Sequence, residues 1–160
     1  MEKWSDFFVA IAGASAALTG LIFVGVSISL EKILAFPRLA DRALMSLSLL
    51  VIVLVVSSLC LVPGQPVYLL GVEYLAIGIL AWIVMLKIEL DILKRTEAKF
   101  KKFSQLSIFL TQFAILPYVI AGTATLYIGF EGIYWLVPAI LFSFIKAVLD
   151  AWVLLVNINR

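Results

Sequence analysis

Two charged residues of this sequence stand in an unexpected, apolar setting: the lysine and the aspartate of KAVLD, Lys146 to Asp150. FSFI precedes them and AWVLLV follows them, so both charges stand in a run that is otherwise soluble in lipid. A charged side chain near the centre of a membrane helix costs about 2.5 to 3.5 kcal/mol on insertion scales. A Lys and an Asp four positions apart share one helix face and compensate each other, although Lys before Asp is the weaker order.

Gln112 is expected at a similar depth, since it lies about ten residues into the preceding apolar run and a helix rises about 1.5 Å per residue. Three interpretations stay open. In the first, Lys146, Asp150 and Gln112 form a polar clamp that sets the register of the helices. In the second, the same residues border an ion or proton pathway, or a gating contact. In the third, the charged pair only extends to the membrane interface.

A second pentapeptide, KIELD at Lys87 to Asp91, repeats the pattern K-x-x-L-D. With the same offset along the chain, the dipeptide LS at 47–48 falls on LS at 106–107. This echo suggests that two helical hairpins are copies of one unit, to which a first helix has been added. Unlike Lys146, Lys87 is expected at the cytoplasmic interface, where a charge costs little.

The composition places these motifs in a bilayer. The chain has 160 residues, of which 64% are hydrophobic and 14% charged, too few polar groups to cover a water-soluble globule. It has no histidine, one cysteine and none of the G-x-x-x-x-G-K-[ST], H-E-x-x-H or G-x-S-x-G patterns. We therefore expect no enzyme activity, no cofactor, no metal site and no nucleic-acid partner.

The elements that position the charges are predicted to be five transmembrane helices in one all-α domain covering residues 1–160. The apolar runs fall at about 6–29, 43–62, 67–90, 104–129 and 133–156, and each reaches the roughly 20 residues that a helix needs to cross the hydrocarbon. The dipeptide Phe36-Pro37 indicates the start of the second helix, and PGQP at 63–66 indicates a tight turn.

Lysine and arginine in the connecting segments predict the orientation, because positively charged flanks stay in the cytoplasm. The connections after the first and third runs are rich in Lys and Arg, whereas PGQP and the FEG at 130–132 contain neither. Only Lys3 opposes an N-terminus outside and a cytoplasmic C-terminus.

The first apolar run is rich in small residues that recur every four positions: Ala12, Ala16 and Gly20, and also Ser15 and Thr19. This spacing lets helix backbones approach closely in lipid. We therefore expect this helix to be buried, packed against its own chain or a neighbouring subunit. Two alternatives stay open: Ser15, Thr19 and Ser27 line a narrow water-accessible pathway, or the helix forms a docking groove for another protein.

Two acidic residues, Glu73 and Glu131, fall at the predicted outer ends of helices. Acidic groups at the mouth of a pathway concentrate cations, but the same residues also suit a solvated surface or a turn.

Two segments carry a resemblance to a known family: WSDFFVAIAGASAALTGLIFVGVSISLEKIL near the N-terminus and YWLVPAILFSFIKAVLDAWVLLV near the C-terminus. They resemble segments of small bacterial multi-span proteins that are labelled modulators of the FtsH protease, over about a third of the chain. The resemblance implies a multi-pass protein of the bacterial inner membrane with a regulatory binding role, and it implies no catalytic or ligand residues.

Together these features favour a homo-oligomeric, channel-like membrane protein that conducts small ions along a subunit interface or symmetry axis. The alternative is a regulatory or scaffold subunit that binds another membrane protein.

Overall fold

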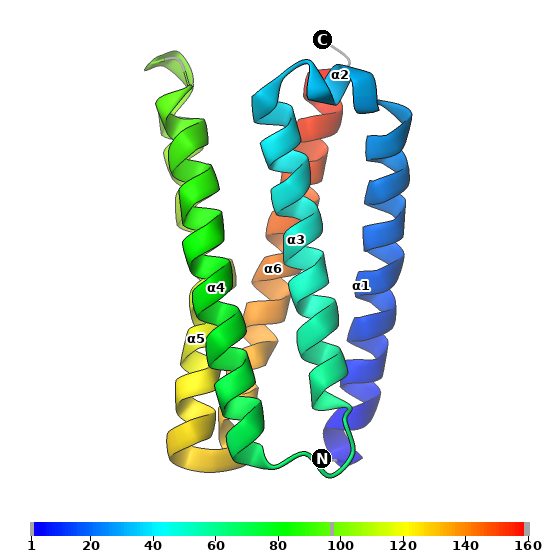
Figure 1. The fold of residues 1–160 in the computed structure, drawn as a ribbon, viewed down its shortest axis with the longest axis vertical. Helices are drawn as coiled ribbons and strands as arrows, with labels where there is room; N and C mark the ends of the chain where they lie inside the picture. The colour runs from blue at the N-terminus through cyan, green and yellow to red at the C-terminus, as the bar shows by residue number, and fades with distance from the viewer. Residues whose placement is uncertain (1, 97, 159–160) are drawn as a thin grey trace. The chain divides into compact units, whose positions relative to one another are not determined.

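The computed structural model describes residues 2–96 and 98–158, and every regular element in that part of the chain is helical (Figure 1). The elements in chain order are α1 (Glu2–Ile28), α2 (Leu30–Leu34), α3 (Pro37–Cys60), α4 (Val67–Lys94), the 3-10 helix η1 (Ala98–Phe100), α5 (Lys101–Ile128), the 3-10 helix η2 (Gly129–Trp135) and α6 (Leu136–Ile158). The all-α class predicted from the sequence is confirmed.

Four segments of the described chain are long and apolar enough to cross a membrane, judged by length and composition. They are Trp4–Ile28, Pro37–Cys60, Val67–Lys94 and Lys101–Val156. The last segment contains both α5 and α6, with the 3-10 turn η2 between them. The runs predicted at 104–129 and 133–156 both fall within it.

The helix ends differ from the ends of the predicted apolar runs. Helix α3 begins at Pro37 and not at residue 43, and α4 continues to Lys94 and not to residue 90. Backbone hydrogen bonding continues into charged flanks, so hydrophobicity marks the membrane-compatible part of a helix and not its ends. Helix α6 begins at Leu136 and not at 133, because η2 occupies the turn after Gly129, whose φ of 75° ends α5.

The chain divides into two compact units, which are described separately. The first contains the residues up to Val62 and those from Phe144 onward, and the second runs from Pro63 to Ser143. Helix α6 therefore contributes its beginning to the second unit and its remainder to the first. The prediction of a single transmembrane domain is not tested by this division and stays a prediction.

In the first unit, α1 packs alongside α3, and the short α2 connects them (Figure 1). The Ser15 hydroxyl donates a hydrogen bond to the Leu50 carbonyl at 2.6 Å and so joins the two helices at mid-length. A buried aliphatic cluster joins α2, α3 and α6 and consists of Ile33, Ala43 and Leu154. A polar contact thus joins α1 to α3 in an apolar seam, and an aliphatic cluster joins α2, α3 and α6.

In the second unit, α4 and α5 approach each other through glycines. A Cβ on Gly122 of α5 would lie 2.5 Å from the Leu75 backbone nitrogen, and a Cβ on Gly78 of α4 would lie 2.9 Å from that of Val119. Neither position has room for a larger side chain, because the obstructing atoms are backbone. Close helix contact through small residues therefore occurs between α4 and α5.

The expectation that the first helix is buried is wrong for the chain by itself. Only 11% of the most apolar part of α1 is buried, and Ala16 and Gly20 are exposed. A Cβ added to Gly13 or Gly20 would meet nothing within 4 Å. Among residues 4–28 of α1, the buried positions are Phe8 and Ser15, seven residues apart, which is the spacing of a narrow seam along one face of a helix.

Candidate functional site

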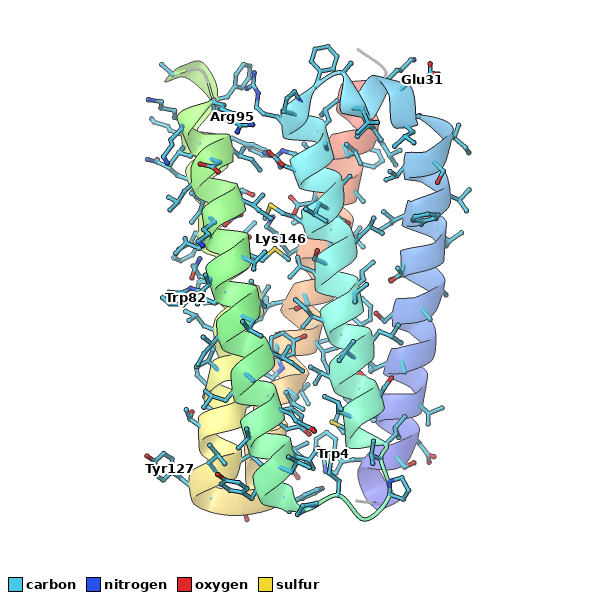
Figure 2. The ribbon with its side chains drawn as sticks, viewed as in Figure 1. Trp4, Glu31, Trp82, Arg95, Tyr127 and Lys146 are labelled. Atoms are coloured by element: carbon cyan, nitrogen blue, oxygen red, sulfur yellow. The ribbon has the colours of Figure 1, made fainter. Side chains whose placement is uncertain are left out.

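An ionic cluster in the first unit joins α3 to α6. The Asp150 carboxylate accepts a hydrogen bond from the Lys146 ammonium through Oδ2 and pairs with Arg42 Nη1 through Oδ1 at 3.4 Å. The side chains of Lys146, Asp150 and Arg42 are only 3%, 4% and 11% exposed. Lys146 lies well within the length of α6 and not at its end (Figure 2).

One face of α3 and one face of α6 position this cluster. Arg42 and Ser46 are one turn apart on α3, and the Ser46 hydroxyl donates to the Ala147 carbonyl of α6 at 2.8 Å. Because Arg42 meets Asp150 while Ser46 meets Ala147, the two helices run antiparallel here. The serine bond holds the helices at the separation and register in which the ion pairs form.

The cluster brings two cations to one carboxylate in an environment with little water. Attraction between buried ions is much stronger than in water, but so is the cost of removing them from water, and good geometry decides the balance. Asp150 receives a cation on each oxygen, and the second cation comes from another helix. The arrangement can therefore hold a negative charge inside an apolar bundle and can change its pairing if one cation moves.

Lys146 and Asp150 thus pair as their spacing suggested, whereas Arg42 belongs to the connection after the first run, whose Lys and Arg residues served only to predict the orientation. The missed signal was the spacing of Arg42 and Ser46, two polar residues on one face of a helix that begins at Pro37. Gln112 belongs to the second unit, where its side-chain oxygen accepts a hydrogen bond from the Trp82 indole at 2.7 Å. Its place in a clamp with Lys146 and Asp150 stays a prediction.

A second polar site, missed in the sequence, lies between α4 and α5 of the second unit. Glu89 is 2% exposed, and its Oε1 accepts a hydrogen bond from the Thr111 hydroxyl at 2.6 Å. The Ser107 hydroxyl donates to the same oxygen at 3.4 Å, one turn away on α5. The hydroxyls of Thr111 and Ser107, on one face of α5, therefore both donate hydrogen bonds to the buried carboxyl group of Glu89.

The signal for Glu89 was its helical spacing, because it lies on the same face of α4 as residues that recur every three or four positions from Gly71 to Ile92. The buried positions are Leu70, Gly71, Tyr74, Gly78, Ala81, Met85, Glu89 and Ile92. Within KIELD, the two charged residues that match KAVLD, Lys87 and Asp91, are both exposed. The pentapeptides are similar in sequence, but their lysines and aspartates have opposite environments, and Glu89 between them is the buried one.

The other predicted site residues lie apart from these clusters. The Thr19 hydroxyl donates to the Ser15 carbonyl one turn earlier at 2.7 Å, and Ala12 is half-buried.

Glu73 accepts a hydrogen bond from the Gln65 amide at 2.6 Å, which connects the PGQP turn to the start of α4. Glu131 is exposed in η2. Among residues 2–96 and 98–158, no three His, Cys, Asp or Glu side chains are grouped to hold a metal ion.

Long apolar helices with ionic groups buried between them define a multi-pass helical membrane protein. Comparison of the chain with family models, with curated proteins and with solved structures finds no match in any of the three.

Proposed function

We propose that this chain is a five-span membrane protein that assembles with copies of itself and conducts small ions. In this proposal α1, α3, α4, α5 and α6 each cross the bilayer, the N-terminus lies outside and the C-terminus in the cytoplasm of a bacterial inner membrane. The bias of Lys and Arg toward the connections after α1 and α4 supports the orientation. The repeated K-x-x-L-D pattern supports a duplicated hairpin, α3–α4 and α5–α6.

The observation that carries the proposal is the carboxylate of Asp150 between the cations of Lys146 and Arg42. Ionisable groups inside membrane helices are costly, and in membrane proteins they mark ion and proton pathways. Glu89, with the hydroxyls of Thr111 and Ser107, adds a second embedded group of the same kind. A pathway that uses exchangeable ionic contacts needs such groups, whereas aliphatic residues would fill the same positions at lower cost.

The exposed small residues of α1 support assembly. Gly13, Ala16 and Gly20 form a strip of small residues on a face of α1 that its own chain leaves exposed. Between copies in lipid, such a strip allows close backbone contact. The strip therefore suits a subunit interface beside which a pathway runs.

The test is ion flux into liposomes that contain the purified protein. We expect flux in the wild type and an altered rate or ion selectivity in Lys146→Met, because this change removes one of the two cations at Asp150. Lys87→Met, which removes the exposed lysine of KIELD, is the matched control and should conduct like the wild type. A folded Lys146→Met protein with unchanged flux would exclude this cluster from the pathway, and an impermeable wild type would exclude conduction.

A regulatory or scaffold role is the second candidate, and the same strip on α1 supports it, since a helix of another membrane protein would fit there equally well. The resemblance to labelled modulators of the FtsH protease points the same way. Cross-linking from a cysteine placed at Ala16 in native membranes distinguishes the two: a homodimer band supports self-assembly, and a single heavier partner supports the regulatory role.

A further inference from the structure

We infer that the first unit binds one acyl chain of a phospholipid in a groove between α1 and α6, with the lipid phosphate beside Lys32 and Arg38. The groove has a volume of about 200 Å³ and is lined by Leu21, Ile22, Gly25 and Val26 of α1 and by Ala151, Leu154 and Leu155 of α6. The inference concerns lipid binding and does not depend on ion conduction.

The lining selects an apolar occupant. Every lining residue is aliphatic or glycine, so no side chain in the groove offers a hydrogen bond. Leu21 and Leu155 at its edge are 70% and 49% exposed, so it opens sideways, toward the hydrocarbon in a membrane. Apart from its chain neighbours and the backbone of its own helix, no atom lies within 4 Å of the place that a Cβ on Gly25 would occupy, so this glycine leaves the groove open.

The size of the groove favours an acyl chain over a protein helix. A helix is about 10 Å across, and close helix packing in lipid needs small residues on both sides. A groove of about 200 Å³ edged by leucines suits a flexible hydrocarbon chain. The small residues Gly13, Ala16 and Gly20 do not line it.

The end of the groove near α2 is where we place the lipid phosphate. Val26 and Leu154 belong both to the groove and to the aliphatic cluster around Ile33. Lys32 precedes Ile33 on α2, and Arg38 precedes Leu39, which packs on the same cluster; both cations are exposed. Glu31 and Asp41 share this end, so the inference rests on two donors to a phosphate and not on an excess of positive charge.

The exposed apolar residues of this end also fit the level of the headgroups. Leu30, Leu34 and Phe36 are exposed while Ile33 is buried, so α2 has apolar residues directed away from the protein. A short helix with exposed leucines and charged neighbours is typical of the boundary between headgroups and acyl chains. A lipid whose phosphate lies beside α2 would direct its chain along the groove.

The experiment is native mass spectrometry of the full chain in detergent with added phosphatidylglycerol, and with diacylglycerol of the same acyl chains. We expect one tightly bound phosphatidylglycerol, and about tenfold weaker binding in Gly25→Leu, since each buried methylene contributes about fourfold in affinity. Ala14→Leu, at an exposed position of α1 that does not line the groove, should bind like the wild type. Lys32→Gln with Arg38→Gln should reduce binding to the level of diacylglycerol.

Equal lipid binding by Gly25→Leu and the wild type would overturn the inference. So would a Gly25→Leu protein that changes its oligomeric state without a change in lipid binding, because the groove would then be an interface between copies. Circular dichroism of both leucine variants shows whether the helices have formed. Ion flux is a separate measurement, so loss of lipid binding with intact flux, or the reverse, separates this inference from the proposed function.

Discussion

Arg42 of α3 and Asp150 of α6 are 108 residues apart in the sequence and form an ion pair at 3.4 Å. The same carboxylate binds Lys146 one turn earlier on its own helix. A local pair in α6 is thereby connected to a second helix. The early and late parts of the first unit are held together by a charge contact that neither helix makes alone.

Removing the shared carboxylate should strongly destabilise the first unit. In Asp150→Asn, Lys146 and Arg42 lose their common anion in a buried site, and breaking a buried pair in this way costs about 3 to 5 kcal/mol. We expect a large decrease in the midpoint of thermal unfolding in detergent, followed by circular dichroism. The matched control is Asp91→Asn in KIELD, where the carboxylate is exposed, and it should leave the midpoint nearly unchanged.

The triple variant Arg42→Met, Lys146→Met and Asp150→Leu removes all three charges of the cluster together. Replacing a buried ionic cluster by apolar residues of similar size is often neutral or stabilising, so the triple variant should recover much of the stability lost in Asp150→Asn. A triple variant as unstable as Asp150→Asn in thermal unfolding would contradict this account of the cluster.

The Thr111 hydroxyl should stabilise the second unit through Glu89. Thr111→Val keeps the shape of the side chain but removes the donor at 2.6 Å, which should cost about 1 to 3 kcal/mol because a buried carboxyl oxygen loses a partner. Ser107→Ala removes the longer 3.4 Å contact and should cost less. Thermal unfolding of the two variants tests the order, and an equal or reversed effect would show that Thr111 is not the main donor.

Glycine at position 122 should be required for the contact between α4 and α5. In Gly122→Ala the new methyl group would lie 2.5 Å from the Leu75 backbone nitrogen, so the helices must separate, at a cost of about 1 to 3 kcal/mol. Gly20→Ala on α1 meets no neighbouring atom within 4 Å and should be neutral or slightly stabilising, because alanine favours a helix. Thermal unfolding of both variants in detergent measures the difference in their stability. No such difference is expected if α4 and α5 do not pack through Gly122.

The Ser15 hydroxyl should contribute modestly to the contact between α1 and α3. Ser15→Ala removes the donor to the Leu50 carbonyl, and hydrogen bonds between membrane helices average about 0.6 kcal/mol. Amide hydrogen exchange should therefore increase in α1. In Ser27→Ala the lost bond is to Phe23 of the same helix, so exchange at the seam should not change. Equal exchange in the two variants would mean that Ser15 does not join the helices.

The sequence alone was sufficient for the helical class and the approximate positions of the apolar segments. Both depend on local properties: the length of an apolar run and the turn signals between runs, such as Pro37 and the PGQP at 63–66. The pairing of Lys146 with Asp150 was also predictable, because a spacing of four residues is a property of one helix.

Only the tertiary structure decided which residues meet between helices. Arg42 reaches Asp150, Thr111 reaches Glu89, and the glycine contact lies on α4 and α5 and not on α1. These outcomes depend on the rotation and depth of each helix against its neighbours. Apolar helix surfaces pack almost equally well in many orientations, so the sequence alone does not show which orientation is most stable. A few buried hydrogen bonds and ion pairs, and close backbone contacts that leave no space for a Cβ, select one orientation.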